Sequence, residues 1–241
     1  MVLMPIKPLS VRVCTFCTQS PLPSQIARII GHIPGRTYMP SKPRKYGVKI
    51  FWACESTTGY ALNGLIYTGK PIDGPPHKNL AFVVVFELVK PFANTGREIV
   101  TDRFFTSHML AVRLLELNLT LLGTVKSGRK EVPNCLRDVK TREVHSVVSL
   151  YDHDNRLVLC SYVPKKNRNV LLLSSSSHCE TQISDDNGKP IQILDYNAHK
   201  GSVDVMDGVI EEFTVRRKTV RWPMLIAYNI MMFHGTMLSF S

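Results

Sequence analysis

The sequence predicts an α/β fold in which a mixed sheet with flanking helices is interrupted by a β-rich insertion. Three observations support this prediction. A strand, a turn and a second strand follow one another over residues 46–67, and a strand–helix–strand unit covers residues 98–126. Between about residues 131 and 200 the chain changes to short strand-like runs that are separated by turn signals.

The first strand pair surrounds a short polar turn. Residues 46–55 are rich in aromatic and β-branched side chains, and residues 60–67 form a second strand-like run. Thr57-Thr58-Gly59 lies between them and has the composition of a turn. The pattern therefore predicts an antiparallel hairpin.

The N-terminal part is harder to interpret. Prolines at positions 5, 8, 21 and 23 exclude one long regular element from residues 1–30, although residues 11–16 have the composition of a short strand. Residues 31–44 and 70–78 are rich in Gly, Pro and basic residues, which is typical of extended connectors.

Residues 79–91 fit two structures. The run from Ala81 to Phe86 favours a strand by its β-branched content, whereas Leu80, Val84 and Leu88, with a stop at Pro91, fit a short helix. The pattern alone leaves both interpretations open.

A strand–helix–strand unit follows. Residues 98–102 form a short strand that ends in the carboxylate of Asp102, and Ser107 is placed to cap a helix. Apolar residues recur at helical spacing from Leu110 to Leu117, and residues 119–126 form the next strand. Such a unit predicts helices packed on a mixed sheet.

The last third of the chain combines strands and helices. Four short runs in the insertion have strand composition, and two later runs have helical patterns. The predicted strands are 144–149, 156–163, 169–174 and 190–196, and the predicted helices are 202–212 and 223–240.

The charge balance points to a polyanionic partner. The chain has 30 Lys and Arg against 19 Asp and Glu, a net charge of +11. Release of counterions drives the binding of such chains to nucleic acid without reading of the base sequence. The alternative is that the charge serves only solubility.

The cysteines and apolar segments exclude several classes of protein. Six cysteines are too few and too scattered for a disulfide scaffold, and Cys14-Thr15-Phe16-Cys17 lacks partners at zinc spacing. The N-terminus has no secretory apolar core, and residues 224–240 fall short of a membrane span. We therefore expect a reducing compartment and no membrane partner.

Three carboxylates are candidates for metal chemistry. Asp102 ends a predicted strand, and Asp204 and Asp207 lie three residues apart, on one face if the segment is helical. Divalent cations such as Mg²⁺ prefer oxygen ligands that converge from separate elements. By spacing alone, Asp204 and Asp207 also fit an ordinary helix start, where negative charge suits the helix dipole.

Several motifs, in a shared order, resemble those of the piggyBac-type transposases and the cellular proteins derived from them. The resemblance covers about residues 31–238. The matching motifs are residues 38–49 (YMPSKPRKYGVK), 101–107 (TDRFFTS), 123–126 with 131–133 (GTVK and EVP), 201–207 (GSVDVMD) and 217–222 (RKTVRW).

The resemblance implies an RNase H-like fold in which three Asp hold two divalent ions, Mg²⁺ or Mn²⁺, for DNA strand cleavage and transfer. It implies that Asp102 and Asp204 are remnants of these catalytic metal ligands, with Asp207 as an acidic partner. It also favours the helix for residues 79–91, a nuclear location and DNA as partner. The implied DNA-contacting residues are Lys126, Arg129, Lys130, Arg216, Arg217, Lys218 and Arg221. A further basic cluster contains Arg36, Lys42, Arg44 and Lys45, and for each cluster solvated surface is the alternative.

The departures from the family pattern predict an incomplete active site. An ungapped count from the signature places the first catalytic Asp on Pro23, which has no carboxylate. Glu55 stands where the family usually has an Asp that is not among the catalytic three. In the alternative of an active enzyme, Glu55 or another group replaces the missing Asp. Arg103 replaces an Asn beside Asp102, where an ion pair would compete with a metal.

We expect a poorly matched segment over residues 1–30, an RNase H-like core in 31–130, a β-rich insertion in 131–200 and C-terminal helices in 201–241. The N-terminal region and the zinc module of longer family members have no counterpart, so specific recognition of transposon ends is not expected. The leading interpretation is a transposase-derived protein with an impaired site and sequence-independent DNA binding. An active nuclease or transposase, and a relic whose first strand is lost, are the alternatives. A homodimer is left open.

Overall fold

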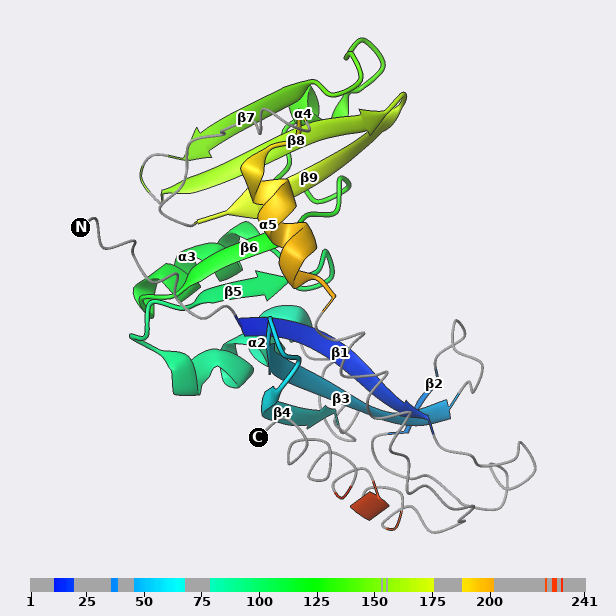
Figure 1. The fold of residues 1–241 in the computed structure, drawn as a ribbon, viewed down its shortest axis with the longest axis vertical. Helices are drawn as coiled ribbons and strands as arrows, with labels where there is room; N and C mark the ends of the chain where they lie inside the picture. The colour runs from blue at the N-terminus through cyan, green and yellow to red at the C-terminus, as the bar shows by residue number, and fades with distance from the viewer. Residues whose placement is uncertain are drawn as a thin grey trace.

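The computed structural model describes residues 11–19, 36–38, 46–67, 79–152, 154, 156–175, 188–201, 224, 227–228 and 231. In residues 11–19, 36–38 and 46–48 it describes the backbone, together with the side chain of Val11. Within these residues the strands form one mixed sheet of nine strands, with the order β2-β3-β1-β5-β6-β9-β8-β7 and β4 paired to β3 (Figure 1).

The N-terminal half of the sheet is built around β1 (Val11–Gln19). Strand β1 pairs antiparallel with β3 (Tyr46–Glu55) along its whole length, and β3 also pairs with β2 (Arg36–Tyr38) and β4 (Ala61–Tyr67). The predicted hairpin over residues 46–67 is therefore confirmed. The predicted N-terminal strand is also present and extends three residues beyond position 16.

The other side of β1 begins the parallel part of the sheet. Strand β5 (Glu98–Thr101) pairs parallel with β1 and with β6 (Thr120–Thr124). The five strands β4-β3-β1-β5-β6 thus form a mixed sheet in which β1 is central. Because parallel neighbours need a crossover, the chain passes through helix α3 (His108–Glu116) between β5 and β6.

The helix over residues 79–91 is confirmed as α2 (Leu80–Val89), followed by a single 3₁₀ turn, η1 (Lys90–Phe92). Its β-branched residues Val84 and Val85 are buried in the core, where burial outweighs their modest helix propensity. The predicted N-cap is also confirmed, because Ser107 Oγ accepts a hydrogen bond from Leu110 N at 3.2 Å.

Two cores cover the two faces of the sheet. The larger core packs α2 and α3 against strand residues that include Phe51, Ile99 and Leu121. The smaller one packs helix α5 (Ile191–His199) through Ile193 against Val100 and Leu122. Figure 1 shows α5 crossing one face of the sheet while α3 lies behind it.

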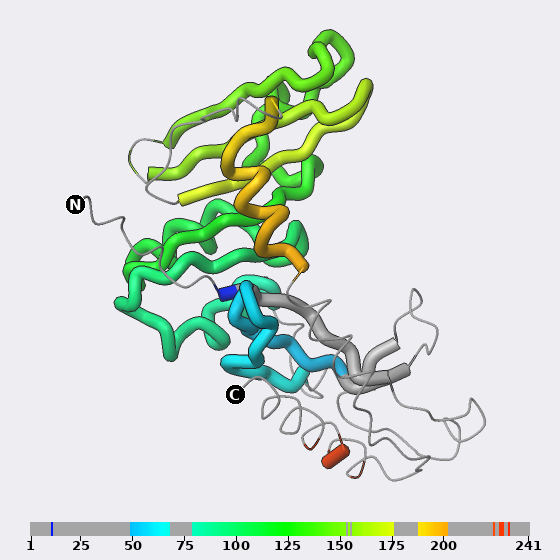
Figure 2. Tube along the Cα trace, viewed as in Figure 1, coloured from blue at the N-terminus to red at the C-terminus, as the bar shows by residue number. Residues whose placement is uncertain are grey.

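The insertion extends the sheet beyond β6. After the short helix α4 (Asn134–Arg137), strands β7 (Val147–Asp152), β8 (Leu157–Lys165) and β9 (Arg168–Ser174) pair antiparallel. Strand β9 joins this unit to β6. Figure 2 traces these strands at the end of the molecule opposite the β3–β4 hairpin.

Two details differ from the sequence predictions. The predicted strand 190–196 is wrong, because these residues begin α5, for which Pro190 is the N-cap. The alternation of Ile191 and Ile193 imitates a strand, but Ile193 and Tyr196 lie on one helical face and pack on the sheet. The first insertion strand begins at residue 147 rather than 144, because His145 has a φ of 67° that interrupts extended backbone.

The predicted C-terminal helices lie largely outside the described residues, and residues 224, 227–228 and 231 within the second one are helical. In the part of the chain that is described, no helix is long and apolar enough to span a membrane.

Candidate active site and nucleic-acid surface

Asp102 lies in the turn that follows β5. Its Oδ1 accepts hydrogen bonds from Phe104 N at 2.8 Å and Phe105 N at 3.4 Å. Its main-chain oxygen accepts bonds from Thr106 N at 3.1 Å and Thr106 Oγ1 at 2.7 Å. One carboxylate oxygen therefore closes the turn between β5 and α3, as Asp side chains commonly do.

A pair of threonine hydroxyls supports this turn from below. Thr106 Oγ1 donates to the Asp102 oxygen, so Thr101 Oγ1 donates to Thr106 Oγ1 across 2.8 Å. Both hydroxyls occupy the space beside Gly123 in β6. A Cβ at Gly123 would lie 2.5 Å from Thr101 Oγ1 and 2.8 Å from the Thr101 oxygen, and it would clash with Thr106 Oγ1. The glycine of the GTVK motif thus makes room for the network that positions Asp102.

The strand next to β5 brings no carboxylate to Asp102. Val13 of β1 pairs with Thr101, so the next residue, Cys14, is level with Asp102. Strand β1 contains neither Asp nor Glu, and the first carboxylate in the sequence is Glu55. The ungapped count placed the first catalytic Asp of the family at Pro23, which lies outside the described residues. Strand β1 ends at Gln19, before Pro23, so that count did not identify the central strand.

Glu55 is the last residue of β3, where its side chain binds the hairpin turn, and it lies far from Asp102. Its carboxylate accepts bonds from Thr57 N at 3.1 Å, Thr58 N at 2.6 Å and Thr58 Oγ1 at 2.5 Å. In the sheet, the backbone of Glu55 pairs with Val11 of β1, and Val11 pairs with Ile99 of β5. Ile99 lies three residues before Asp102. Three residues along the strand and two strand spacings across separate the two backbones by about 14 Å. Glu55 is therefore not a ligand partner for Asp102.

The pKa of Glu55 reflects this structural role. Burial raises it, but the hydrogen bonds from Thr58 and Thr57 outweigh burial and hold the pKa below its ordinary value of 4.5. A carboxyl with a depressed pKa stabilises the fold above its unfolded pKa and loses this contribution as the pH falls through the folded value. The charge of Glu55 therefore stabilises the hairpin at neutral pH.

We predict that Glu55→Gln lowers the free energy of unfolding by about 2 kcal/mol at pH 7, because the amide cannot accept bonds at both of its terminal atoms. The difference between the variant and the parent should shrink below about pH 4.5 in urea titrations. Glu87→Gln, which removes an exposed pair with Lys90, is the control and should change stability by less than about 0.5 kcal/mol. A Glu55→Gln difference that stays constant down to low pH would contradict the prediction.

The described residues do not fit a two-metal centre. Among them no group of three His, Cys, Asp or Glu side chains is placed to hold a metal ion. Asp204 and Asp207, the other predicted ligands, lie outside the described residues. Arg103, which is described and exposed, forms no ion pair with Asp102 among the contacts found in the described chain, so the predicted competition is not seen.

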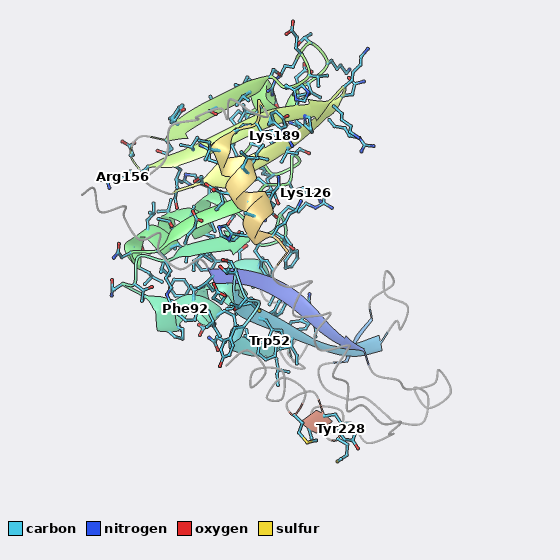
Figure 3. The ribbon with its side chains drawn as sticks, viewed as in Figure 1. Trp52, Phe92, Lys126, Arg156, Lys189 and Tyr228 are labelled. Carbon is cyan, nitrogen blue, oxygen red and sulfur yellow. The ribbon has the colours of Figure 1, made fainter. Side chains whose placement is uncertain are left out.

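Basic residues gather at the end of the sheet where Asp102 lies. Lys126, Arg129 and Lys130 follow the carboxyl end of β6. Arg129 Nη2 donates to the Phe104 oxygen at 3.1 Å, which ties this loop to the Asp102 turn. In Figure 3, Lys126 lies at the opposite end of the strands from Arg156. The other predicted DNA contacts, Arg216, Arg217, Lys218 and Arg221, lie outside the described residues, as do the side chains of the Arg36–Lys45 cluster.

The sequence analysis missed part of this surface. Strand β9 runs antiparallel to β6, so its first residue, Arg168, lies beyond the carboxyl end of β6. Lys165, which ends β8 and pairs with Arg168, and Lys166 in the turn lie there too. Lys189 and Lys200 flank helix α5. We call Lys126, Arg129, Lys130, Lys165, Lys166, Arg168, Lys189 and Lys200 the basic end. The run KKNR at 165–168 was visible in the sequence, but its location was not.

One more cation lies beside the Asp102 turn. The ammonium of Lys49 in β3 is 4.6 Å from the ring centroid of Phe51 and 5.5 Å from that of Phe104. Phe104 follows Asp102 closely and is 48% exposed. Cation–π contact holds Lys49 near the same end of the sheet.

Together, the central β1, the parallel β5 and β6, and a carboxylate at the end of β5 form an RNase H-like arrangement. A family model described as Transposase IS4 matches residues 16–234. The chain therefore belongs to this transposase family, and within it to the piggyBac-type transposases.

A solved relative supports this assignment. The fold is similar to that of a piggyBac transposase in a synaptic complex with hairpin DNA, with a TM-score of 0.84 and 34% sequence identity. The match covers 96% of this chain and 46% of the transposase chain, so the chain spans about half the length of that relative. The RNase H-like fold and the piggyBac resemblance are confirmed.

Proposed function

We propose that this chain is a piggyBac transposase-derived domain that binds DNA without reading its sequence and does not cleave it. The observation that carries the proposal is the strand beside Asp102. Central strand β1 has no carboxylate, and none occurs in residues 1–54. Two dications need several negative ligands on adjacent elements, and β1 supplies none to Asp102.

DNA binding is supported by charge placement. The basic end collects cations from the β6 loop, the β8–β9 turn and both ends of α5, and Arg129 of the β6 loop contacts the Asp102 turn. Clustered Lys and Arg on one part of a surface bind the phosphate backbone by releasing counterions. The solved relative was determined with DNA, which supports the same partner for this chain.

Metal response tests the impaired site. We predict that millimolar Mn²⁺ or Mg²⁺ leaves the thermal midpoint of the full chain unchanged and that supercoiled plasmid is not nicked. Metal binding to a site whose dissociation constant is 100-fold below the metal concentration would raise the free energy of unfolding by about 2.7 kcal/mol. For a chain of this size that corresponds to a rise of about 5–10 °C.

Two variants make this measurement decisive. Asp102→Asn and Asp204→Asn should respond to metal as the parent does. Two results would overturn the proposal that the site is impaired and would support an active nuclease. One is a rise in midpoint that occurs in the parent and disappears in either variant. The other is metal-dependent nicking that Asp102→Asn abolishes. In that case a ligand other than Glu55 would have to complete the site, because Glu55 lies about 14 Å from Asp102.

The relic interpretation is weakened by β1. That interpretation required the loss of a central strand, and residues 11–19 fill this place by pairing with both β3 and β5. A cooperative melt of the purified chain is therefore expected. We further propose that the core of residues 31–130 also includes β1, with the insertion in residues 131–200 and the C-terminal helices in residues 201–241. We also propose a nuclear location, which suits a protein whose partner is DNA.

A further inference from the structure

Helix α5 and strands β6, β8 and β9 line a cavity of about 350 Å³ that is open to solvent. Its floor is apolar and includes Leu172 and Ile193, which are buried in the smaller core. Tyr196 lines one side, and its hydroxyl lies 3.4 Å from Thr124 Oγ1 of β6. Two lysines, Lys189 and Lys200, also line the cavity.

This cavity lies beside the Asp102 turn. Thr101 pairs with Gly123, so Asp102, the first residue after β5, is level with Thr124, the last residue of β6, about one strand spacing (about 5 Å) away. Thr124 lines the cavity, which therefore opens the α5 face of the sheet at the level of Asp102.

The cavity also adjoins the basic end. Pro164 and Val170, which lie on either side of the β8–β9 turn, line it. Lys165 ends β8, Lys166 lies in the turn and Arg168 begins β9. Lys189 and Lys200 are themselves members of the basic end. A polyanion bound there would lie directly against the cavity.

The lining combines three kinds of chemistry that a nucleotide needs. Apolar side chains with the Tyr196 ring offer a surface for a base, since base–aromatic stacking tolerates any base. The Asn197 amide and the hydroxyls of Thr124 and Tyr196 can pair with polar base edges. Lys189 and Lys200 suit phosphate and disfavour a cation. The volume falls within the usual range for small-molecule sites, which begins near 300 Å³.

We infer that this cavity holds one unpaired nucleotide of a DNA strand bound along the basic end. The inference rests on the proposed DNA binding and adds a preference for DNA with an unpaired base. A base inside a duplex is stacked and cannot enter a side-chain pocket, so the occupant comes from an overhang, a flap or a strand end.

The test compares three DNA probes with the full chain at fixed salt. The probes are a blunt duplex, the same duplex with a short single-stranded overhang, and the same overhang built from abasic residues that keep every phosphate. We expect the overhang with bases to bind about tenfold more tightly than the abasic overhang, as expected for one stacked base.

Matched variants assign the effect to this cavity. Tyr196→Leu keeps apolar bulk but removes the ring, and it should abolish the tenfold difference while leaving blunt-duplex affinity within about twofold. Tyr60→Leu, which alters an exposed tyrosine in the β3–β4 turn, should keep the difference. Thermal melts confirm that both variants are folded, and the comparison of probes in the parent chain does not depend on either variant.

Each remaining outcome has a distinct meaning. Equal binding of both overhangs, with salt-sensitive binding of the blunt duplex, would overturn the cavity assignment and leave the proposed function intact. A tenfold difference that persists in Tyr196→Leu would place the unpaired base elsewhere and also overturn the assignment. If no probe binds in a salt-sensitive way, both the cavity assignment and the proposed DNA binding are wrong.

Discussion

Gly123→Ala is expected to lower the free energy of unfolding by about 3 kcal/mol, because an added methyl group has no space in β6. The new Cβ would clash with the hydroxyl of Thr106 and would lie 2.5 Å from Thr101 Oγ1 and 2.8 Å from a main-chain oxygen. The main-chain oxygen belongs to β5 and cannot rotate away, so the parallel β5–β6 pair must separate. Urea denaturation of the full chain measures the change.

Gly128→Ala is the control for this prediction. Gly128 lies five residues later in the exposed loop, and a Cβ there meets no atom within 4 Å. Its substitution should change stability by less than about 0.5 kcal/mol. If Gly123→Ala is as mild as Gly128→Ala, the threonine network does not constrain β6, and its support of the Asp102 turn is wrong.

Replacing Lys165, Lys166 and Arg168 together with Gln is expected to weaken duplex DNA binding about 100-fold at 0.15 M salt. Each phosphate contact contributes about 0.9 to the slope of log K against log salt, so the triple variant should lose about 2.7 from that slope. At 1 M salt this electrostatic contribution vanishes and the parent and variant should bind equally. A slope difference of about 2.7 then gives the stated loss of affinity at 0.15 M salt. Titrations of a short duplex over a range of salt concentrations measure both quantities.

A second triple variant separates position from total charge. Lys90, Arg97 and Arg113 carry the same charge but lie on η1, on the segment leading into β5 and on α3, away from the basic end. Their replacement by Gln should reduce the slope much less. Equal losses in the two triple variants would mean that DNA responds only to net charge, and the basic end would not be a binding surface.

Local patterns in the sequence determined most of the elements. The β3–β4 hairpin follows from alternating β-branched and aromatic residues around a polar turn, and α3 follows from its Ser107 cap and apolar spacing. The residues that surround Asp102 were also evident, because the TDRFFTS and GTVK motifs are contiguous. Local patterns failed where burial decided the outcome, as in residues 190–196, where two isoleucines alternate in a helix.

The sequence by itself determined that this is a basic chain with piggyBac-type motifs and without Asp or Glu before Glu55, since residue types and motif order do not depend on packing. Only the tertiary structure decided that β1 fills the central position, that the Glu55 side chain binds the hairpin turn, and that the β8–β9 turn and α5 bring cations to the end where Asp102 lies. These are relations between segments far apart in the chain. They depend on strand register and helix packing, which one sequence pattern does not encode.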